Sequence, residues 1–248
     1  MKRANSRRRI LRGAAALLAL ALIAACAVYL NTYYVASPEA LRAVSAPAEG
    51  VTVEADGNRI AFIPDAPRAG LVFYPGGKVQ CEAYAPLMER CAQEGILCVL
   101  LRMPFNLAVF APDAAGGVAA GYPQVGRWFI GGHSLGGVMA SRYAAAHADE
   151  WAGVALLASY STENLRESGL AALTLTGSED GVLNRKAYEK ARANLPADAW
   201  ERVLPGGNHA QFGSYGLQRG DGVAAIAPEA QWDETAHTIM EWMAAAAE

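Results

Sequence analysis

Gly132-His133-Ser134-Leu135-Gly136 is the stretch that decides the fold, because it fits the pattern Gly-x-Ser-x-Gly between a strand and a helix. The apolar run 128–130 before it is typical of a buried strand, and residues 138–146 after it read as a helix. In this setting the serine lies on a sharp, strained turn, and its small neighbours let strand and helix approach closely. The pattern predicts an exposed hydroxyl beside a helix N-terminus that favours negative charge. A glycine-rich turn without chemistry is the alternative that the pentapeptide alone leaves open.

Composition predicts one folded domain of ordinary size with an uneven distribution of charge. The 248 residues are 53% hydrophobic, which supplies enough apolar material for a packed core. The formal net charge is −3, but six of the 21 basic residues lie at positions 2–12, and no acidic residue occurs before Glu39. The rest of the chain is therefore acidic, which argues against nucleic acid as a partner.

The basic cluster adjoins a segment that predicts membrane insertion. Residues 13–30 are 18 consecutive residues without a charge, about the lower limit for a helix that spans a bilayer. Positive charge on the N-terminal side predicts that this end stays in the cytoplasm and that the body lies outside the cell membrane. Three fates remain open: a retained single-pass anchor, a cleaved signal peptide that releases a secreted body, or a lipid anchor on Cys26.

The cysteines predict neither a metal site nor a defined disulfide. Cys26 lies in the apolar segment, and the other three are an odd number for pairing. The sequence has no Cys-x-x-Cys pair and no Cys/His cluster at metal-binding spacing. We therefore expect no metal and no cofactor, and we leave open one disulfide among Cys81, Cys91 and Cys98.

The apolar runs predict an α/β fold. Strands that are apolar on both faces and alternate with helices predict a mostly parallel sheet with helices on both faces. A hairpin over 51–63, a last strand at 202–204 and a terminal amphipathic helix at 228–247 complete the pattern. The buried-type strands are predicted at 71–74, 96–101, 128–130, 154–158 and 172–175.

A serine hydroxyl needs a base, and His209 is the histidine best placed to serve as one. It lies in the glycine-rich loop 205–213 after the last predicted strand, where functional groups tend to gather. His133 lies inside the turn and is expected to point away from the serine, while His147 ends a helix and His237 lies within the terminal helix. We therefore predict His209 as the general base, with a loop histidine of no role as the alternative.

The acid that orients the histidine is expected between Ser134 and His209, on a loop after a strand. Thr176-Gly177-Ser178-Glu179-Asp180-Gly181 is such a loop. Asp180 has glycine three residues before it and one after it, so a sharp turn can aim its carboxylate at the histidine. Glu179 is the competing acid, and capping of the next helix is the alternative role for both.

Two backbone N–H groups must face the negative charge that develops on a substrate carbonyl oxygen. The N–H of Leu135, directly after the serine, is the first candidate. The second is expected from Pro75-Gly76-Gly77-Lys78, the loop after the strand that ends at Tyr74. Gly77 and Lys78 are alternatives for this second donor.

Five motifs together resemble the α/β-hydrolase superfamily. More narrowly, the chain is similar to small bacterial hydrolases of the dienelactone-hydrolase-like branch, which often carry an N-terminal membrane anchor. The resemblance implies an α/β-hydrolase fold with Ser134, Asp180 and His209 as a catalytic triad. It departs from the dienelactone hydrolases themselves, because their nucleophile is a cysteine. The motifs are residues 73–79, 102–108, 131–137, 177–182 and 207–213.

The chain divides most simply into three segments. We expect a membrane anchor or signal segment at 1–30, a stalk or linker at 31–50 and the catalytic domain at 51–248. The interval between Ala158 and Asp180 is too short for a large cap domain. The sequence therefore predicts an open cleft.

These features predict a serine hydrolase, and most simply a carboxylesterase that acts on a small or exposed acyl substrate. His209 would take the proton of Ser134, the serine would attack an ester carbonyl, and water would release the acyl group. Two alternatives stay open: an acyltransferase on the same triad, and an inactive hydrolase fold that serves as a surface binding module. The candidate substrate-binding residues, for which core packing is the alternative, are Phe105, Asn106, Phe212 and Tyr215.

Overall fold

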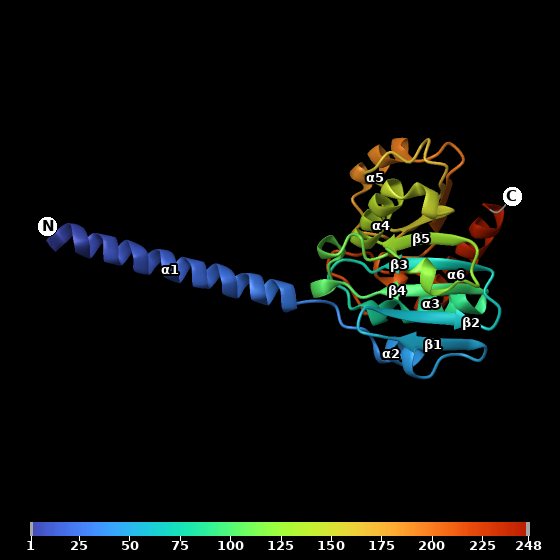
Figure 1. Ribbon diagram of the computed structural model, residues 1–248, viewed down its shortest axis with the longest axis horizontal. Coiled ribbons are helices and arrows are strands. Elements are labelled where there is room, and N and C mark those ends of the chain that lie inside the picture. The colour runs from blue at the N-terminus through green and yellow to red at the C-terminus, as the bar shows by residue number, and fades with distance from the viewer. Residues whose placement is uncertain (1, 247–248) are drawn as a thin grey trace. The chain divides into compact units, whose positions relative to one another are not determined.

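The computed structural model describes residues 2–246 of a chain that divides into two compact units, Met1–Tyr33 and Tyr34–Glu248. The first unit is built on a single helix, α1 (Lys2–Asn31), drawn in blue in Figure 1. Its segment Leu11–Asn31 is long and apolar enough to cross a membrane, a test that a signal sequence also passes.

The second unit is built on one eight-stranded sheet with the strand order β1-β2-β4-β3-β5-β6-β7-β8. Strands β1 and β2 form the predicted antiparallel hairpin, and β2 also pairs antiparallel with β4. All the other pairings are parallel, as strands with two apolar faces predict. Figure 1 shows β1, β2, β4, β3 and β5 side by side in this order. The strands are β1 (Val51–Ala55), β2 (Arg59–Pro64), β3 (Ala69–Tyr74), β4 (Ile96–Leu101), β5 (Trp128–His133), β6 (Gly153–Leu157), β7 (Ala171–Gly177) and β8 (Trp200–Leu204).

Helices cover both faces of the sheet and create two cores. Helices α2, α3 and α6 lie on one face, where Leu87 and Trp232 pack in the same cluster as Phe73 of β3. Helices α4 and α5 lie on the other, where Met139 packs in the same cluster as Val72, the preceding residue of β3. This arrangement confirms the predicted α/β-hydrolase fold. The helices are α2 (Pro38–Ser45), α3 (Ala85–Gln93), α4 (Leu135–Ala146), α5 (Arg185–Ala191) and α6 (Pro228–Ala245), with 3-10 turns at Cys81–Tyr84, Pro104–Asn106, Ala108–Phe110, Ala119–Gly121, Ala148–Glu150, Arg192–Asn194 and Ala210–Phe212.

The parallel strands bring their carboxyl ends to one edge of the sheet, which we call the active-site edge. No large cap covers it. Between β6 and β7 the described chain has neither helix nor strand, and between β7 and β8 it holds α5 and one 3-10 turn. The prediction of a fold without a large cap is therefore confirmed.

Residues 34–50, which the sequence predicts as part of a stalk, instead pack on the larger unit. Ser37 caps α2 by accepting the Ala40 N–H at 3.1 Å, and Ala36, Ala40 and Ala43 are buried. These small side chains let α2 lie close against α3. Three small alanine side chains form too weak a hydrophobic pattern for the sequence alone to predict that this segment packs on the domain.

Candidate active site

Ser134 lies in the turn directly between β5 and α4, at the active-site edge. Its backbone has φ 53° and ψ −123°, a conformation that is strained for any residue except glycine. The Ser134 N–H donates to the Leu157 carbonyl oxygen at 2.9 Å, and the Ser159 hydroxyl donates to the Ser134 carbonyl oxygen at 2.6 Å. A Cβ atom on Gly136 would lie 2.2 Å from the Tyr74 carbonyl oxygen, so the turn requires glycine there.

The structure brings His209 and Asp180 together at the same edge of the sheet. His209 Nδ1 lies 2.9 Å from Asp180 Oδ2, and both side chains are buried. Because an ionised carboxylate only accepts hydrogen bonds, Nδ1 carries the proton of a neutral His209 and Nε2 keeps its lone pair. Among the described residues His209 Nε2 has no hydrogen-bond partner. The ring of His133, the residue just before Ser134, lies 4.4 Å from the His209 ring.

Asp180 is held in the ionised form by its surroundings. Burial opposes ionisation, but the His209 hydrogen bond and charge, with the N–H groups of Val182 and Leu183, outweigh it and lower the pKa of Asp180. These two N–H groups donate to Asp180 Oδ1 at 2.9 and 2.8 Å. The competing acid Glu179 is exposed. The geometry therefore favours Asp180 over Glu179 as the partner of His209.

Asp221 ties together the loops that carry Asp180 and His209, and sequence reasoning missed it. Its carboxylate accepts the backbone N–H groups of Gly181 at 3.1 Å, His209 at 3.3 Å and Ala210 at 2.8 Å. Such charge-assisted hydrogen bonds are stronger than neutral ones. The glycines on either side of Asp221 were the available signal, because they allow a tight turn.

His133 lies closer to the candidate catalytic groups than the sequence predicts. Its Nδ1 is 2.7 Å from the Tyr84 hydroxyl, which accepts the Gly76 N–H at 3.0 Å. Its ring also packs against Phe212, at 5.6 Å between centroids. Burial, and then the charge of His209, lower the pKa of His133 well below its usual value, so this imidazole stays neutral.

The backbone of the predicted oxyanion loop separates the two alternatives for the second donor. The Lys78 N–H donates to the Asn106 carbonyl oxygen at 2.7 Å and is therefore occupied. Within residues 2–246, the Gly77 N–H has no hydrogen-bond acceptor. A Cβ atom on Gly77 would lie 2.9 Å from Leu135 Cδ2, so Gly77 and Leu135 lie side by side. This arrangement favours Gly77, with Leu135, as the pair of donors.

The four candidate substrate-binding residues fall into two groups. Phe105 is 53% exposed and Asn106 is half-buried, and both lie in the turn next to Lys78. Phe212, in contrast, has no exposed surface, and Tyr215 is 8% exposed and packs against Tyr34. The structure therefore places Phe212 and Tyr215 in the core, where they offer a substrate almost no surface.

Backbone strain gathers at the active-site edge. In the described part of the chain, every non-glycine residue with positive φ follows the carboxyl end of β3, β4, β5 or β6. Strain of this kind persists only where the surrounding packing holds it, and it is characteristic of functional sites. The residues are Lys78, Phe105, Asn106, Ser134 and Ala158.

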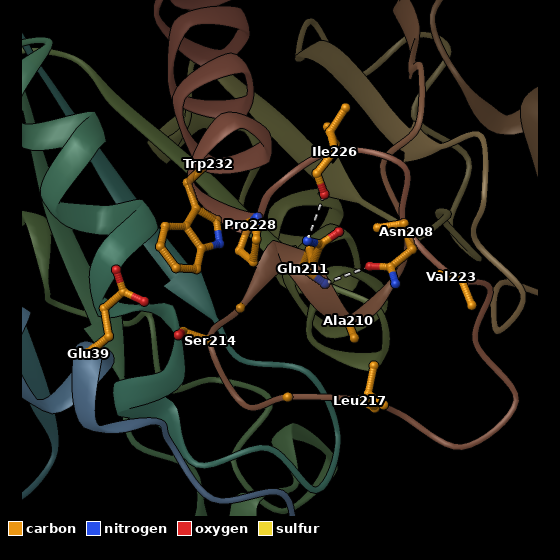
Figure 2. A pocket seen from close by; sticks show the side chains of 13 residues that line it. Glu39, Asn208, Ala210, Gln211, Ser214, Leu217, Val223, Ile226, Pro228 and Trp232 are labelled. Carbon is orange, nitrogen blue, oxygen red and sulfur yellow. Dashed lines mark hydrogen bonds between the residues drawn. The ribbon is translucent and has the colours of Figure 1, made fainter.

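A pocket of about 300 Å³ adjoins the loop of His209 (Figure 2). Gln211 crosses it, donating from its side chain to the Ile226 carbonyl oxygen at 3.1 Å and from its N–H to Asn208 Oδ1 at 3.0 Å. Trp232, on α6, also lines the pocket. Ser134, the candidate nucleophile, is not among the residues that line this pocket.

The thiols form neither a disulfide nor a metal cluster. Cys81, Cys91 and Cys98 are buried and free. Within residues 2–246, no three His, Cys, Asp or Glu side chains gather in a way that could hold a metal ion.

The fold and the strained serine turn define the class of α/β hydrolases. The protein belongs to the alpha/beta hydrolase family, since residues 70–233, well over half of the chain, match the model of that family. This match confirms the superfamily resemblance found in the sequence. A comparison with curated proteins finds no match.

Solved structures share this fold at low sequence identity. A predicted CIB-like hydrolase from Thermoplasma acidophilum is 14% identical, with a TM-score of 0.56 over 77% of this chain and 100% of that one. Dienelactone hydrolase from Anabaena variabilis is 15% identical, with a TM-score of 0.54 over 78% and 97% of the two chains. Carboxyl esterase 2 from the fungus Tuber melanosporum is 10% identical, with a TM-score of 0.59 over 84% and 90%. At such identities the likeness establishes the fold alone.

Proposed function

We propose that this hydrolase is a serine carboxylesterase that forms an acyl-enzyme on Ser134. The observation that carries the proposal is the state of His209. Its Nδ1 is bound to the buried Asp180, its Nε2 has no partner among the described residues, and its ring lies against that of the residue preceding Ser134. A base held in this tautomer is prepared to accept a proton at Nε2.

The reaction follows from these positions. His209 Nε2 takes the hydroxyl proton as Ser134 Oγ attacks the ester carbonyl, and the N–H groups of Gly77 and Leu135 stabilise the oxyanion. The protonated His209 then gives its proton to the departing alcohol, which leaves the acyl group on Ser134. Water, activated by the same histidine, attacks the acyl-enzyme and releases the carboxylic acid and the free serine.

The open active-site edge supports a small or exposed acyl substrate, because no large cap encloses an acyl chain. Of the candidate substrate-binding residues, the exposed Phe105 and half-buried Asn106 are those that a substrate could reach. The names of the similar dienelactone hydrolase and carboxyl esterase agree with ester chemistry.

The N-terminal helix supports a second part of the proposal, namely attachment to the cell membrane. Leu11–Asn31 is long and apolar enough to span the bilayer, and basic residues precede it. This charge pattern favours a cytoplasmic N-terminus and a catalytic unit outside the cytoplasm.

Labelling with a fluorophosphonate probe tests the nucleophile, and a series of p-nitrophenyl esters of increasing chain length tests the ester chemistry. We expect the wild type to be labelled and active, Ser134→Ala to lose both properties with its fold intact, and Ser45→Ala to retain both. Ser45 is a matched control because it is exposed on α2. Labelling that survives in Ser134→Ala would refute the assignment of the nucleophile. Ester turnover that needs an added alcohol or amine acceptor would instead favour an acyltransferase.

A further inference from the structure

The chain enters the larger unit directly beside the candidate oxyanion loop. The Tyr34 N–H donates to the Lys78 carbonyl oxygen at 2.7 Å, and the Gln80 N–H donates to the Tyr34 carbonyl oxygen at 2.9 Å. These bonds form a short parallel β-bridge next to the end of β3. The point of entry is therefore fixed at the active-site edge.

The link from this point to the apolar helix segment is very short. Only Thr32 and Tyr33 lie between Tyr34 and Asn31, where the segment ends. Three peptide units reach at most about 11 Å when fully extended. Chain connectivity alone thus keeps Tyr34 and the adjoining oxyanion loop close to the end of the segment. If Leu11–Asn31 spans a bilayer, this short link keeps Tyr34 and the adjoining loop near the membrane.

Most of the exposed large apolar side chains of the larger unit belong to three segments at this edge. They follow Tyr34, β4 and the His209 turn, and their exposure reaches 90% at Leu217 and 87% at Val223. In the rest of residues 34–246, the exposed large apolar side chains are Leu41 and Val203. We call the group the apolar rim, and its members are Val35, Phe105, Val109, Phe110, Leu217 and Val223.

Hydrogen bonds connect the three segments of the apolar rim. The Asn106 carbonyl oxygen, next to Phe105, accepts the Lys78 N–H at 2.7 Å. The Tyr34 hydroxyl accepts the Arg219 N–H at 3.3 Å, in the loop that carries Leu217. Figure 2 shows Leu217 and Val223 on this loop, around the pocket next to Ala210. The rim is thus built onto the same loops that hold the candidate oxyanion donor and base.

Exposed apolar groups scattered singly need no explanation, but a group of them around one site marks a binding surface. Phe105 and Phe110 also contact each other edge to face, with 5.7 Å between ring centroids, so part of the rim is already assembled. The membrane helix, joined to this edge by two residues, identifies the surface that the rim would meet. Apolar and aromatic side chains insert into the boundary between lipid headgroups and acyl chains.

We propose that the apolar rim docks on the lipid surface of the membrane that α1 spans, so that Ser134 receives its ester from the lipid phase. The substrate class is then an ester that is dissolved in, or anchored to, the bilayer. The docking does not depend on catalysis, whereas the substrate class rests on the proposed esterase function.

Brominated lipids test the docking without any readout of activity. The full chain is placed in phosphatidylcholine vesicles with either plain or brominated acyl chains, and Phe110→Trp is compared with Val203→Trp. Val203 is a matched control because it is 60% exposed on the edge strand β8 and does not belong to the rim. Subtracting the wild-type emission isolates the new tryptophan. We expect bromine to reduce the added emission of Phe110→Trp by roughly half or more, since the insertion depth of about 5–10 Å reaches the acyl chains. Emission of Val203→Trp should be unchanged.

Equal emission of Phe110→Trp in both kinds of vesicle would overturn the docking. The same comparison in a Ser134→Ala background should give the same quenching, because docking requires no chemistry. Quenching without activity on any ester would support docking and refute the esterase function, so the two failures are distinguishable.

The substrate class is tested with a double variant of two rim residues, Phe110→Ser with Leu217→Ser, in the full chain. We expect hydrolysis of a long-chain p-nitrophenyl ester dissolved in the vesicles to fall about tenfold, as apolar contact with the bilayer is lost. Hydrolysis of p-nitrophenyl acetate in water should be unchanged. Unchanged hydrolysis of the vesicle-borne ester would overturn the lipid-phase assignment.

Discussion

The Tyr84 hydroxyl lies 2.7 Å from His133 Nδ1 and links two loops that the sequence places far apart. On its other side it accepts the Gly76 N–H at 3.0 Å. Gly76 precedes the candidate oxyanion donor Gly77. His133 precedes the candidate nucleophile Ser134 and contacts the ring of His209. The buried Tyr84 hydroxyl therefore connects the segments that carry the candidate donor, the candidate nucleophile and the candidate base.

Replacement of Tyr84 by Phe should impair both stability and catalysis. Two buried polar groups, the Gly76 N–H and His133 Nδ1, lose their partner, which we expect to lower the free energy of unfolding by about 2 kcal/mol. We expect kcat for ester hydrolysis to fall roughly tenfold, or about 1.4 kcal/mol in the barrier. Tyr188→Phe is the control, because its buried hydroxyl bonds to Thr174 of β7. A loss of kcat in Tyr188→Phe as large as in Tyr84→Phe would contradict a positioning role for Tyr84.

The choice between the two neighbouring acids is tested by Asp180→Asn and Glu179→Gln. An amide at position 180 no longer stabilises a positively charged His209 and allows the wrong tautomer, so kcat should fall by about three to four orders of magnitude. Glu179→Gln should retain wild-type kcat, because the side chain of Glu179 is exposed. Steady-state ester hydrolysis with both variants decides the matter, and a larger loss in Glu179→Gln would reverse the assignment.

Asp221→Asn tests the carboxylate that joins the loops of acid and base. The amide retains one acceptor oxygen, so part of the charge-assisted bonding to the N–H groups of Gly181, His209 and Ala210 is lost. We expect kcat to fall about tenfold with little change in KM, because the carboxylate binds backbone N–H groups of the two loops. Asp198→Asn, at an exposed position before β8, serves as the control. A rise in KM at constant kcat would argue for a direct role in substrate binding.

The parts of the site that the sequence predicts are those carried by local patterns. The serine turn needs glycine at position 136 because the Tyr74 carbonyl oxygen lies against it. This requirement appears in the sequence as the second glycine of the Gly-x-Ser-x-Gly motif. Asp180 and His209 each follow a predicted strand, so parallel topology alone brings their loops to one edge.

The parts that sequence reasoning missed depend on contacts between distant segments. Tyr84 meets His133 only through the packing of α3 against the sheet, and no periodicity marks that pairing. Phe212 and Tyr215 were also misassigned for this reason. An aromatic residue in a loop next to the candidate base gives the same sequence pattern whether its side chain faces a substrate or packs in the core. Their burial depends on Tyr34 and Tyr84, which arrive from far earlier in the chain.

Acid should destabilise the protein through His133. Burial, and then the charge of His209, lower the pKa of His133 well below its usual value of 6.5. The unfolded chain therefore binds a proton below pH 6.5 that the folded chain does not, and stability falls as the pH drops below that value. The slope for one such group is about 1.4 kcal/mol per pH unit.

Urea unfolding of the full chain in detergent between pH 7.5 and 5 measures this slope. His133→Gln should remove the contribution of one proton from the slope of stability against pH. The variant is expected to be less stable overall. An unchanged slope in His133→Gln would show that another group carries the effect.

Gly77→Ala tests the candidate oxyanion donor. A second substitution, at Leu135, tests whether the effect arises from displacement of the Gly77 N–H. A Cβ atom on Gly77 would lie 2.9 Å from Leu135 Cδ2, which is too close, so either the Leu135 side chain or the loop has to shift. We expect kcat to fall by about two orders of magnitude, the loss typical of one missing oxyanion donor. Gly57→Ala is the control, because a Cβ atom there would meet no other atom within 4 Å.

Truncation of Leu135 should rescue this loss. Leu135→Ala removes Cδ2 and leaves the Leu135 Cβ, at 3.4 Å, as the nearest of the Leu135 atoms to the new methyl group. In the double variant Gly77 and Leu135 regain their spacing, so kcat should return to within about tenfold of the Leu135→Ala single variant. The measurement is a double-mutant cycle on kcat for one p-nitrophenyl ester. If Gly77→Ala turns over at the wild-type rate, or if Leu135→Ala restores nothing, the second oxyanion donor has to be sought elsewhere than at Gly77.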